Sequence, residues 1–289
     1  MKHHKQYAAQ MKDHSFGLAL YHPVSTRVLR PGSVGYWNSD GIWQPVAFLD
    51  DSASLKKMRL ESPEEGLTRA VFQPITDWDR MYSKYVTELT FSPANAEVNS
   101  AAPVIPVAGS VKLEYQATQD FGALLITASP VHHDAYYYES PFKRWVKNNI
   151  DALYDCPISE EIRTRGLSIV TDTYSTKKCS IKTWSGSSRK VSVEFKVNAE
   201  GIIDVGPESS WKINSTSGDA SYYQGKEPDE EVVVFASGFV FWIRKLLGKK
   251  SYSVDELKMR TKKLPQAEND QNRSTKPEEE LVDSETGTS

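Results

Sequence analysis

Three segments of this chain alternate apolar and polar residues at nearly every step: Leu167–Tyr174, Cys179–Trp184 and Val191–Val197. In the third segment every second residue is valine or phenylalanine, with serine, glutamate and lysine between them. Because successive side chains of a strand point to opposite faces, each segment predicts a strand with one apolar and one polar face. In a globular protein the apolar face covers a core, whereas in a membrane β-barrel it meets lipid.

The composition suits a globular protein, and the charge is unevenly distributed. The 289 residues are 39% apolar and 25% charged, enough to bury a core in one large or two small domains. The net charge of −3 suggests no class of partner, and we expect no nucleic acid. Residues 241–264 hold eight basic residues against two acids, and residues 265–289 hold seven acids against two basic residues. This pattern is typical of an appendage rather than of a core.

Cysteine content and hydropathy restrict where the chain can act. Cys156 and Cys179 are too few for a disulfide framework, so we expect reduced thiols in the cytosol, with a single bridge as the alternative. No long apolar run follows Met1–Lys5, so we expect no secretory signal. The longest apolar stretch, Val232–Ile243, is shorter than the ~20 residues of a membrane helix. Entry into a bilayer would therefore require closed β-structure.

Local patterns predict a mixture of helices and strands, hence an α+β fold. Tyr7, Ala8 and Met11 would form the apolar side of an N-terminal helix. Glycine at the end of Asn38–Gly41 permits a tight turn, so a hairpin is expected. Residues 62–109 contain five prolines and predict a mobile connection with fragments of strand. The strands expected here and further along are residues 33–38, 42–48, 110–115, 123–127, 211–215 and 232–243.

Helix signals occur at three places in the second half of the chain. Ser140-Pro141 predicts a helix start, and residues 159–165 predict a short helix that Gly166 ends. Ser253–Glu256 has the form of a capping box and predicts a helix over residues 254–263. From Pro265 onward the polar composition predicts disorder. The apolar face of the helix after Ser140, with one polar interruption, would consist of Phe142, Trp145, Val146, Asn149, Ile150 and Leu153.

No catalytic pattern emerges from the sequence. None of the six histidines has a metal-site spacing to a cysteine or acid, and adjacent His132 and His133 would point to opposite faces of a strand. A phosphate-binding loop and a serine nucleophile elbow are also missing. We therefore expect no enzyme, catalytic residue, metal or cofactor. The alternative is an enzyme whose site is scattered through the fold.

Four short stretches follow one another in an order known from one family. They are a Trp43-Gln44-Pro45 loop, Gly-Ser-Val-Lys-Leu at Gly109–Leu113, the helix stop and two strands of Arg165–Thr183, and Glu-Val-Val-Val-Phe-Ala at Glu231–Ala236. They resemble the Trp-x-Pro loop, the "Gly-Ser-Val-Glu-Leu" strand, the "Tyr-Val-Val-Thr-Glu" strand with its charged successor, and the late "Leu-Ala-Phe" strand of the gasdermin pore-forming domain. The chain departs from mammalian members after Arg244, where a short tail similar to those of fungal and bacterial members replaces the helical repressor domain.

The resemblance implies a domain organisation and an activity. The fold would be a twisted antiparallel sheet with surrounding helices over residues 1–245, followed by a basic hinge with an inhibitory helix over 246–264 and an acidic disordered tail over 265–289. The inactive protein would be a cytoplasmic monomer or small oligomer. A protease would remove the tail, and the body would bind acidic phospholipids, oligomerise and refold into a transmembrane β-barrel in a pyroptosis-like cell death. The alternative is a non-lytic lipid- or protein-binding module.

The resemblance also assigns the membrane hairpins, one to about residues 67–127 and one to residues 167–197. Lys182, Glu194 and Lys196 would face the water-filled lumen. A half-buried sheet in the closed protein explains the same alternation. The lipid-facing positions would be Leu167, Ile169, Ile181, Val191, Val193, Phe195 and Val197.

The same resemblance implies which residues bind lipid and which regulate the protein. Basic residues gain ~1 kcal/mol each near anionic lipid, although a solvated helix face also explains them. Trp43 would insert at the interface, or form a cross-strand core pair with Trp37. Val254 and Leu257 would hold the inhibitory helix on the body. The expected lipid contacts are Lys2, Lys5, Lys12, Ile42, Trp43, Lys143, Arg144 and Lys147. The expected cleavage region is Gly248, Lys249, Lys250, Ser251, Tyr252 and Ser253.

Overall fold

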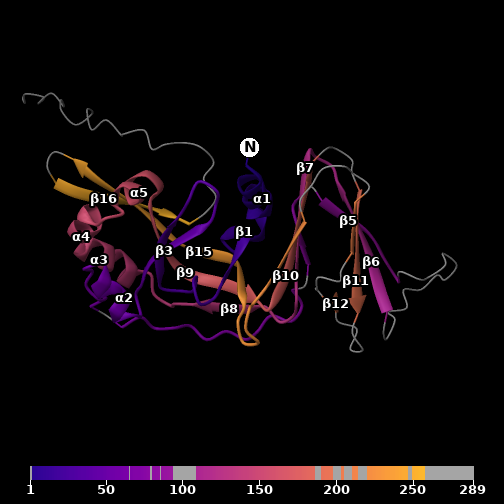
Figure 1. The fold of residues 1–289 in the computed structure, drawn as a ribbon, viewed down its shortest axis with the longest axis horizontal. Coiled ribbons are helices and arrows are strands. Elements are labelled where there is room, and N and C mark those ends of the chain that lie inside the picture. Colours follow the sequence, from indigo (N-terminus) through magenta and orange to yellow (C-terminus); the bar gives the residue numbers. More distant parts are fainter. Residues whose placement is uncertain are drawn as a thin grey trace, which may run out of the picture. The chain divides into compact units, whose positions relative to one another are not determined.

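A computed structural model describes residues 2–64, 66–78, 80–84, 86–93, 109–185, 190–197, 203–204, 210–213, 220–246 and 249–257. They belong to one compact unit that extends to Met259. The unit has the predicted α+β composition, with antiparallel strands in three sheets and short helices beside them (Figure 1). The acidic tail, residues 265–289, lies outside the described residues.

The largest sheet, called the main sheet, has seven strands. Its order is β1-β15-β9-β2-β3, and β16 also pairs with β15 and β8 with β9. Every neighbouring pair is antiparallel. The strands are β1 (Leu18–Ser25), β2 (Ser33–Trp37), β3 (Trp43–Phe48), β8 (His132–Ala135), β9 (Leu167–Thr176), β15 (Val232–Leu246) and β16 (Lys249–Glu256).

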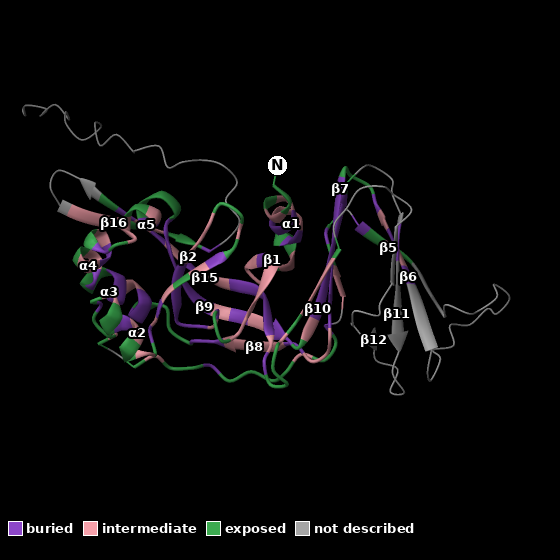
Figure 2. Ribbon diagram, viewed as in Figure 1, coloured by how far each residue is buried: buried purple, intermediate pink, exposed green. Residues whose placement is uncertain are grey.

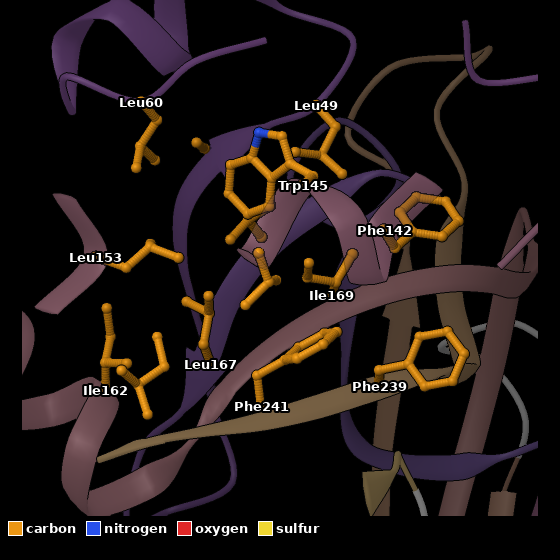
Figure 3. Close-up of a cluster of buried hydrophobic side chains, with 14 of the residues drawn as sticks. Leu49, Leu60, Phe142, Trp145, Leu153, Ile162, Leu167, Ile169, Phe239 and Phe241 are labelled. Atoms are coloured by element: carbon orange, nitrogen blue, oxygen red, sulfur yellow. The ribbon is translucent and has the colours of Figure 1, made fainter. Parts of the chain in front are cut away.

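Four short helices pack against the main sheet: α2 (Ser52–Lys57), α3 (Ser140–Asn148), α4 (Ile150–Asp155) and α5 (Ser159–Arg165). Their apolar side chains point toward those of β9 and β15 and form the helix-side core (Figure 3). Burial of apolar surface is the dominant favourable term in folding, so this cluster holds the helices in place. It includes Phe142, Trp145, Leu153, Ile162, Leu167, Ile169, Phe239 and Phe241.

The polar interruption in the predicted helix face marks a break between two helices. α3 ends at Asn148 and α4 begins at Ile150. The buried Asn149 between them donates from Nδ2 to the Trp145 carbonyl oxygen (3.0 Å), and its Oδ1 accepts from the Glu61 N–H (2.7 Å). The buried side-chain amide of Asn149 is thus hydrogen-bonded through both its nitrogen and its oxygen.

We predict that Phe241→Ala strongly destabilises the protein. Phe241 is fully buried, and its ring centroid lies 5.7 Å from that of Tyr252. Truncation of a buried phenylalanine costs about 3–5 kcal/mol, because it loses transfer free energy and leaves a cavity. Urea unfolding monitored by circular dichroism measures the loss, with the exposed Lys147→Ala on α3 as the control. Equal unfolding midpoints for the two variants would contradict the assignment of this core.

The N-terminal helix, α1 (His3–Met11), buries Tyr7, Ala8 and Met11 as predicted. It packs on β1 and on β7 (Phe121–Thr127). The cluster beneath it, called the α1 core, joins side chains of the main sheet to those of a second sheet. None of the helices in the described part of the chain has the length and apolar character needed to cross a bilayer.

The other two sheets stack beside the main sheet and are called the middle and outer sheets. The middle sheet has the order β14-β10-β7-β4, and the outer sheet β12-β11-β6-β5 with β13 also paired to β11. The strands not yet bounded are β4 (Arg80–Tyr82), β5 (Val86–Pro93), β6 (Gly109–Ala117), β10 (Lys178–Ser185), β11 (Lys190–Val197), β12 (Ile203–Asp204), β13 (Ser210–Ile213) and β14 (Ala220–Gln224).

The two central strands of the middle sheet, β7 and β10, are buried on both faces (Figure 2). Leu125 and Ile181 belong to the α1 core on one side. Leu124 and Trp184 belong to a separate cluster on the other side, which we call the interlayer core. The interlayer core consists of eight buried residues: Val86, Leu113, Tyr115, Ala117, Leu124, Ile126, Trp184 and Val191.

The three alternating segments are all strands, but the expected polar face is wrong for β9 and β10. On β9 the side chains of Ser168, Thr173 and Ser175 are buried, and on β10 those of Ser180 and Lys182 are buried too. The reason is tertiary, because both strands lie inside stacked layers that cover both of their faces. Short polar side chains tolerate this burial when they are hydrogen-bonded, as Ser175 Oγ is to Glu231 (2.7 Å).

The predicted mobile connection is partly fixed against β8. The Ala70 N–H donates to the Ala135 carbonyl oxygen (2.8 Å), and the Ile75 N–H donates to that of Val131 (2.8 Å). Arg69 pairs with Asp134 (2.6 Å). Residues 66–78 therefore form an extended strap along this strand, whereas residues 94–108 lie outside the described part.

The helix predicted at the C-terminal end is wrong in its described part. Residues 249–256 form β16, which pairs with Phe239–Leu246 of β15 in eight register positions. Tyr252 and Val254 pack against the helix-side core, as alternate residues of a strand do. The capping-box sequence has only a local preference for helix, and pairing with the edge of β15 overrides that preference.

Candidate functional site

The structure brings α1 and the β2–β3 turn together. Lys2 Nζ donates to Asp40 Oδ1 (2.6 Å) and to the Ser39 carbonyl oxygen (3.0 Å). A Cβ atom at Gly41 would lie 2.6 Å from His4 Cδ2, so the turn closely approaches the helix. Two of the three segments predicted to contact lipid thus form one surface. We call it the α1–turn surface: Lys2, His4, Lys5, His22 and the turn residues Asn38–Ile42.

The turn itself has the predicted geometry. Asn38 Oδ1 accepts from the N–H groups of Asp40 (2.9 Å) and Ile42 (3.0 Å), and Gly41 adopts φ +76°. A side-chain oxygen that caps the turn in this way stabilises it. It leaves the Ile42 side chain 42% exposed at the tip.

Trp43 does not lie on this surface. Its side chain is buried, it pairs with Trp37 in the β2–β3 register, and the two ring centroids are 4.9 Å apart. The cross-strand core pair therefore describes Trp43 in this conformation, and contact with lipid does not. The physical reason is that an indole one residue before the strand interior gains more from packing than from exposure at the tip.

The charges of the α1–turn surface are coupled. The hydrogen bond from Lys2 holds the pKa of Asp40 below its usual value, although solvent screens this exposed pair. Burial and the neighbouring Lys5, His22 and Lys2 lower the pKa of His4, opposed by Asp40. Burial also lowers the pKa of His22, again opposed by Asp40. Both imidazoles are therefore harder to protonate than an ordinary histidine.

The basic residues of α3 lie apart from this surface. α3 packs in the helix-side core, whereas α1 packs on β1 and β7 (Figure 1). Lys143 Nζ pairs with Glu139 (3.1 Å) and lies 4.6 Å from the ring centroid of Phe239, so its charge already has partners within the protein. Arg144 and Lys147 are exposed, as is Lys12 at the end of α1. The predicted lipid contacts thus form two groups rather than one.

The predicted lipid face of the second hairpin is divided among three cores in this conformation. Leu167 and Ile169 belong to the helix-side core, Ile181 to the α1 core and Val191 to the interlayer core. These positions do not form one continuous face in the closed protein, because β9, β10 and β11 belong to three different sheets. Their role as the lipid face of an inserted hairpin stays a prediction. The side chains of Val193, Phe195 and Val197 lie outside the described part.

The predicted cleavage region is a paired strand rather than an exposed loop. Lys249 through Ser253 belong to β16, and Gly248 lies outside the described residues. Lys250 Nζ pairs with Asp155 (2.7 Å) and Asp151 (2.9 Å) of α4. Proteases need an accessible, unpaired segment, so residues 249–253 are a poor substrate.

Val254 and Leu257 pack on the body as expected, but Val254 does so from β16 and Leu257 from the residue that follows it, not from a helix. Val254 is partly buried against the helix-side core. Leu257 is buried with Leu20 and Trp43 in another cluster, and its N–H donates to the Gly238 carbonyl oxygen (2.8 Å). The described chain is therefore anchored as far as Leu257.

Two histidine–carboxylate pairs were not predicted. His132 Nδ1 lies 2.6 Å from Glu231, and His133 Nε2 lies 3.3 Å from Asp172. Hydrogen bonds from His133 and Thr171 outweigh burial and lower the pKa of Asp172. The partners are 99 and 39 residues apart in sequence, so no spacing pattern could reveal them. Across the described residues, no group of three or more His, Cys, Asp or Glu side chains could hold a metal ion.

Comparison with protein-family models and with curated proteins finds no match to this chain. The two cysteines are free thiols in separate clusters, Cys156 in the helix-side core and Cys179 in the α1 core. Burial raises the pKa of the Cys179 thiol. A buried thiol with a raised pKa is unreactive, so Cys179 acts as a core residue.

Proposed function

We propose that this chain is a pore-forming cell-death effector of the gasdermin type. The closed form binds acidic phospholipids of a cellular membrane through the α1–turn surface. Copies then assemble side by side. The strands of the outer sheet refold and pair with those of neighbouring copies to form a transmembrane β-barrel. Proteolytic removal of the tail after Leu257 activates the protein, because β16 belongs to the body.

The observation that carries this proposal is the register of β6 with β11. The two strands come from the two segments that resemble the membrane hairpins, residues 67–127 and 167–197. They pair antiparallel over Gly109–Gln116 and Lys190–Val197, so that apolar residues stand opposite apolar ones and polar residues opposite polar ones. The apolar pairs include Val191 with Tyr115, Val193 with Leu113 and Phe195 with Val111, and the polar pairs include Ser192 with Glu114 and Glu194 with Lys112.

Such a pair of strands can exchange one environment for another without changing its own pattern. Leu113 and Tyr115 of β6 and Val191 of β11 contribute to the interlayer core in the closed form, and the apolar positions of the pair would meet lipid in a barrel. β6 and β11 have nine and eight residues, close to the ~9–11 that a tilted membrane strand needs. The match in length and alternation supports the assignment of both segments.

The contact between the middle and outer sheets contains a buried lysine. Lys182 on β10 is fully buried, on the same face as Trp184 of the interlayer core. Removal of an ammonium group from water carries a large free-energy penalty. Separation of the two sheets would return Lys182 to water, as the lumen of a barrel also would.

Insertion and assembly must occur together. A single hairpin in lipid would leave unpaired N–H and C=O groups along both edges, at several kcal/mol each. Neighbouring copies remove those edges by pairing with them. The proposed pore is therefore a homo-oligomer.

Leakage of a dye from vesicles tests the proposal. We expect residues 1–257 to release the dye from vesicles of phosphatidylcholine and phosphatidylglycerol, and the full chain to release much less. Vesicles of phosphatidylcholine alone serve as the control and should stay intact. Membrane binding without leakage would favour the non-lytic binding module instead, and equal leakage by both chains would exclude inhibition by the tail.

A further inference from the structure

One histidine lies against the β2–β3 turn, and a second is coupled to it electrostatically. His4 on α1 lies against Gly41, and His22 is on the neighbouring strand β1. His4 interacts electrostatically with His22, and both interact with Asp40. The other charged groups near His4 are Lys2 and Lys5 of α1. The two imidazoles are therefore members of the α1–turn surface, beside the exposed side chain of Ile42.

The charge of this surface depends on the protonation of the two histidines. With both imidazoles neutral, two lysines and one aspartate give a charge of +1; with both protonated the charge is +3. Burial lowers the pKa of both side chains, so each gains its positive charge at a lower pH than an ordinary histidine does. Asp40 keeps its negative charge there, because its hydrogen bond from Lys2 lowers its pKa.

We propose that the α1–turn surface is an acid-responsive docking site for anionic membranes, in which protonated His4 and His22 add to the charge of Lys2 and Lys5. The proposal rests on the proposed membrane-binding function and adds a regulation to it. The occupant is a lipid surface, because the site combines exposed positive charge with an exposed apolar tip at Ile42. Charge attracts the surface to anionic headgroups, and the isoleucine can enter the interface.

The closed protein opposes protonation, and the membrane favours it. The folded-state pKa values of His4 and His22 lie below the unfolded value. The stability that the two neutral side chains contribute is therefore present above pH ~6.5 and is lost as the pH falls through their folded values. Anionic lipid stabilises the charged imidazoles, so membrane binding and proton binding promote each other. Acid thus loosens the contact between α1 and the turn and strengthens their contact with lipid.

Sedimentation with vesicles measures the effect without requiring a pore. Each added charge near an anionic surface raises the partition coefficient about fivefold, so two charges raise it about 25-fold. We expect this rise between about pH 7.5 and about pH 5 on vesicles containing phosphatidylglycerol, and its loss at high salt. The double variant His4→Gln/His22→Gln should bind equally at both pH values. The matched control His14→Gln, from the adjoining 3₁₀ helix (Lys12–His14), should keep the rise.

Three outcomes overturn the proposal. They are a full acid response in the folded double variant, an equal response on phosphatidylcholine alone, and a response that high salt does not reduce. Circular dichroism of each variant shows whether it is folded. As a second measurement, the imidazole resonances of His4 and His22 should titrate at higher pH with anionic nanodiscs than without them, and unchanged titration would also overturn it. Acid-dependent binding without leakage would contradict the proposed pore formation and support this docking site.

Discussion

Aspartate at Val193 and Phe195 is expected to abolish pore formation by residues 1–257. In the proposed barrel both positions of β11 face lipid, where a charged side chain costs up to about 2–4 kcal/mol at the midplane. A ring of copies repeats that cost in every subunit, so insertion should fail even where membrane binding persists. Dye leakage from vesicles containing phosphatidylglycerol should fall by at least about tenfold, since each 1.4 kcal/mol is a factor of ten.

Lys196→Asp is the matched control for this variant. It places the same side chain in the same strand, one residue from Phe195 and therefore on the opposite face. In a barrel that face lines the lumen, so leakage should persist with altered ion selectivity. Vesicle sedimentation separates a pore defect from a loss of binding. Full leakage by the Val193→Asp/Phe195→Asp protein would refute the assignment of β11 to the membrane wall.

Truncation on the two sides of β16 is expected to have opposite results. Removal of the chain after residue 248 deletes the partner of Phe239–Leu246 and the side chains of Tyr252, Val254 and Leu257. Burial of a large apolar side chain contributes about 1.5–3 kcal/mol. Their combined loss is on the order of 5 kcal/mol, comparable with the 5–15 kcal/mol that stabilises a whole domain. The shorter protein should therefore be unfolded or aggregated.

Truncation after Leu257 should leave the fold intact. It retains β16 and the buried Leu257, and deletes only residues outside the described part. Thermal unfolding and limited proteolysis of the two truncated proteins and the full chain make the comparison. A protein of residues 1–248 that unfolds at the same temperature as the full chain would show that β16 is dispensable. In that case an inhibitory role for residues 249–257 would again be open.

Elements with a complete local signal were predicted correctly from the sequence. Gly166 adopts φ +82° and ends α5 where expected, because only glycine enters that conformation without strain. The strands on either side of the Asn38–Gly41 turn form the predicted hairpin, and the three alternating segments are strands. In each case the residues that decide the structure lie within a few positions of one another.

Features that depend on distant partners were not predicted. Ser253–Glu256 has a helical signal, yet the free edge of β15 makes it a strand. His132 meets Glu231, and Lys2 meets Asp40, through contacts that only the folded chain creates. From the sequence alone, Trp43 could lie exposed at the tip of the hairpin or be buried in a core. Its pairing with Trp37 shows that it is buried.

The amino-acid sequence determined which side chains of each strand share a face, since the backbone alternates them without reference to anything else. It did not determine what covers those faces. In β9 and β10 the stacking of three sheets buried polar residues that the alternation assigns to water. The α1–turn surface likewise exists only because α1, β1 and the β2–β3 turn pack together. Burial depends on the neighbours that a layer acquires in three dimensions, and only the tertiary structure supplies them.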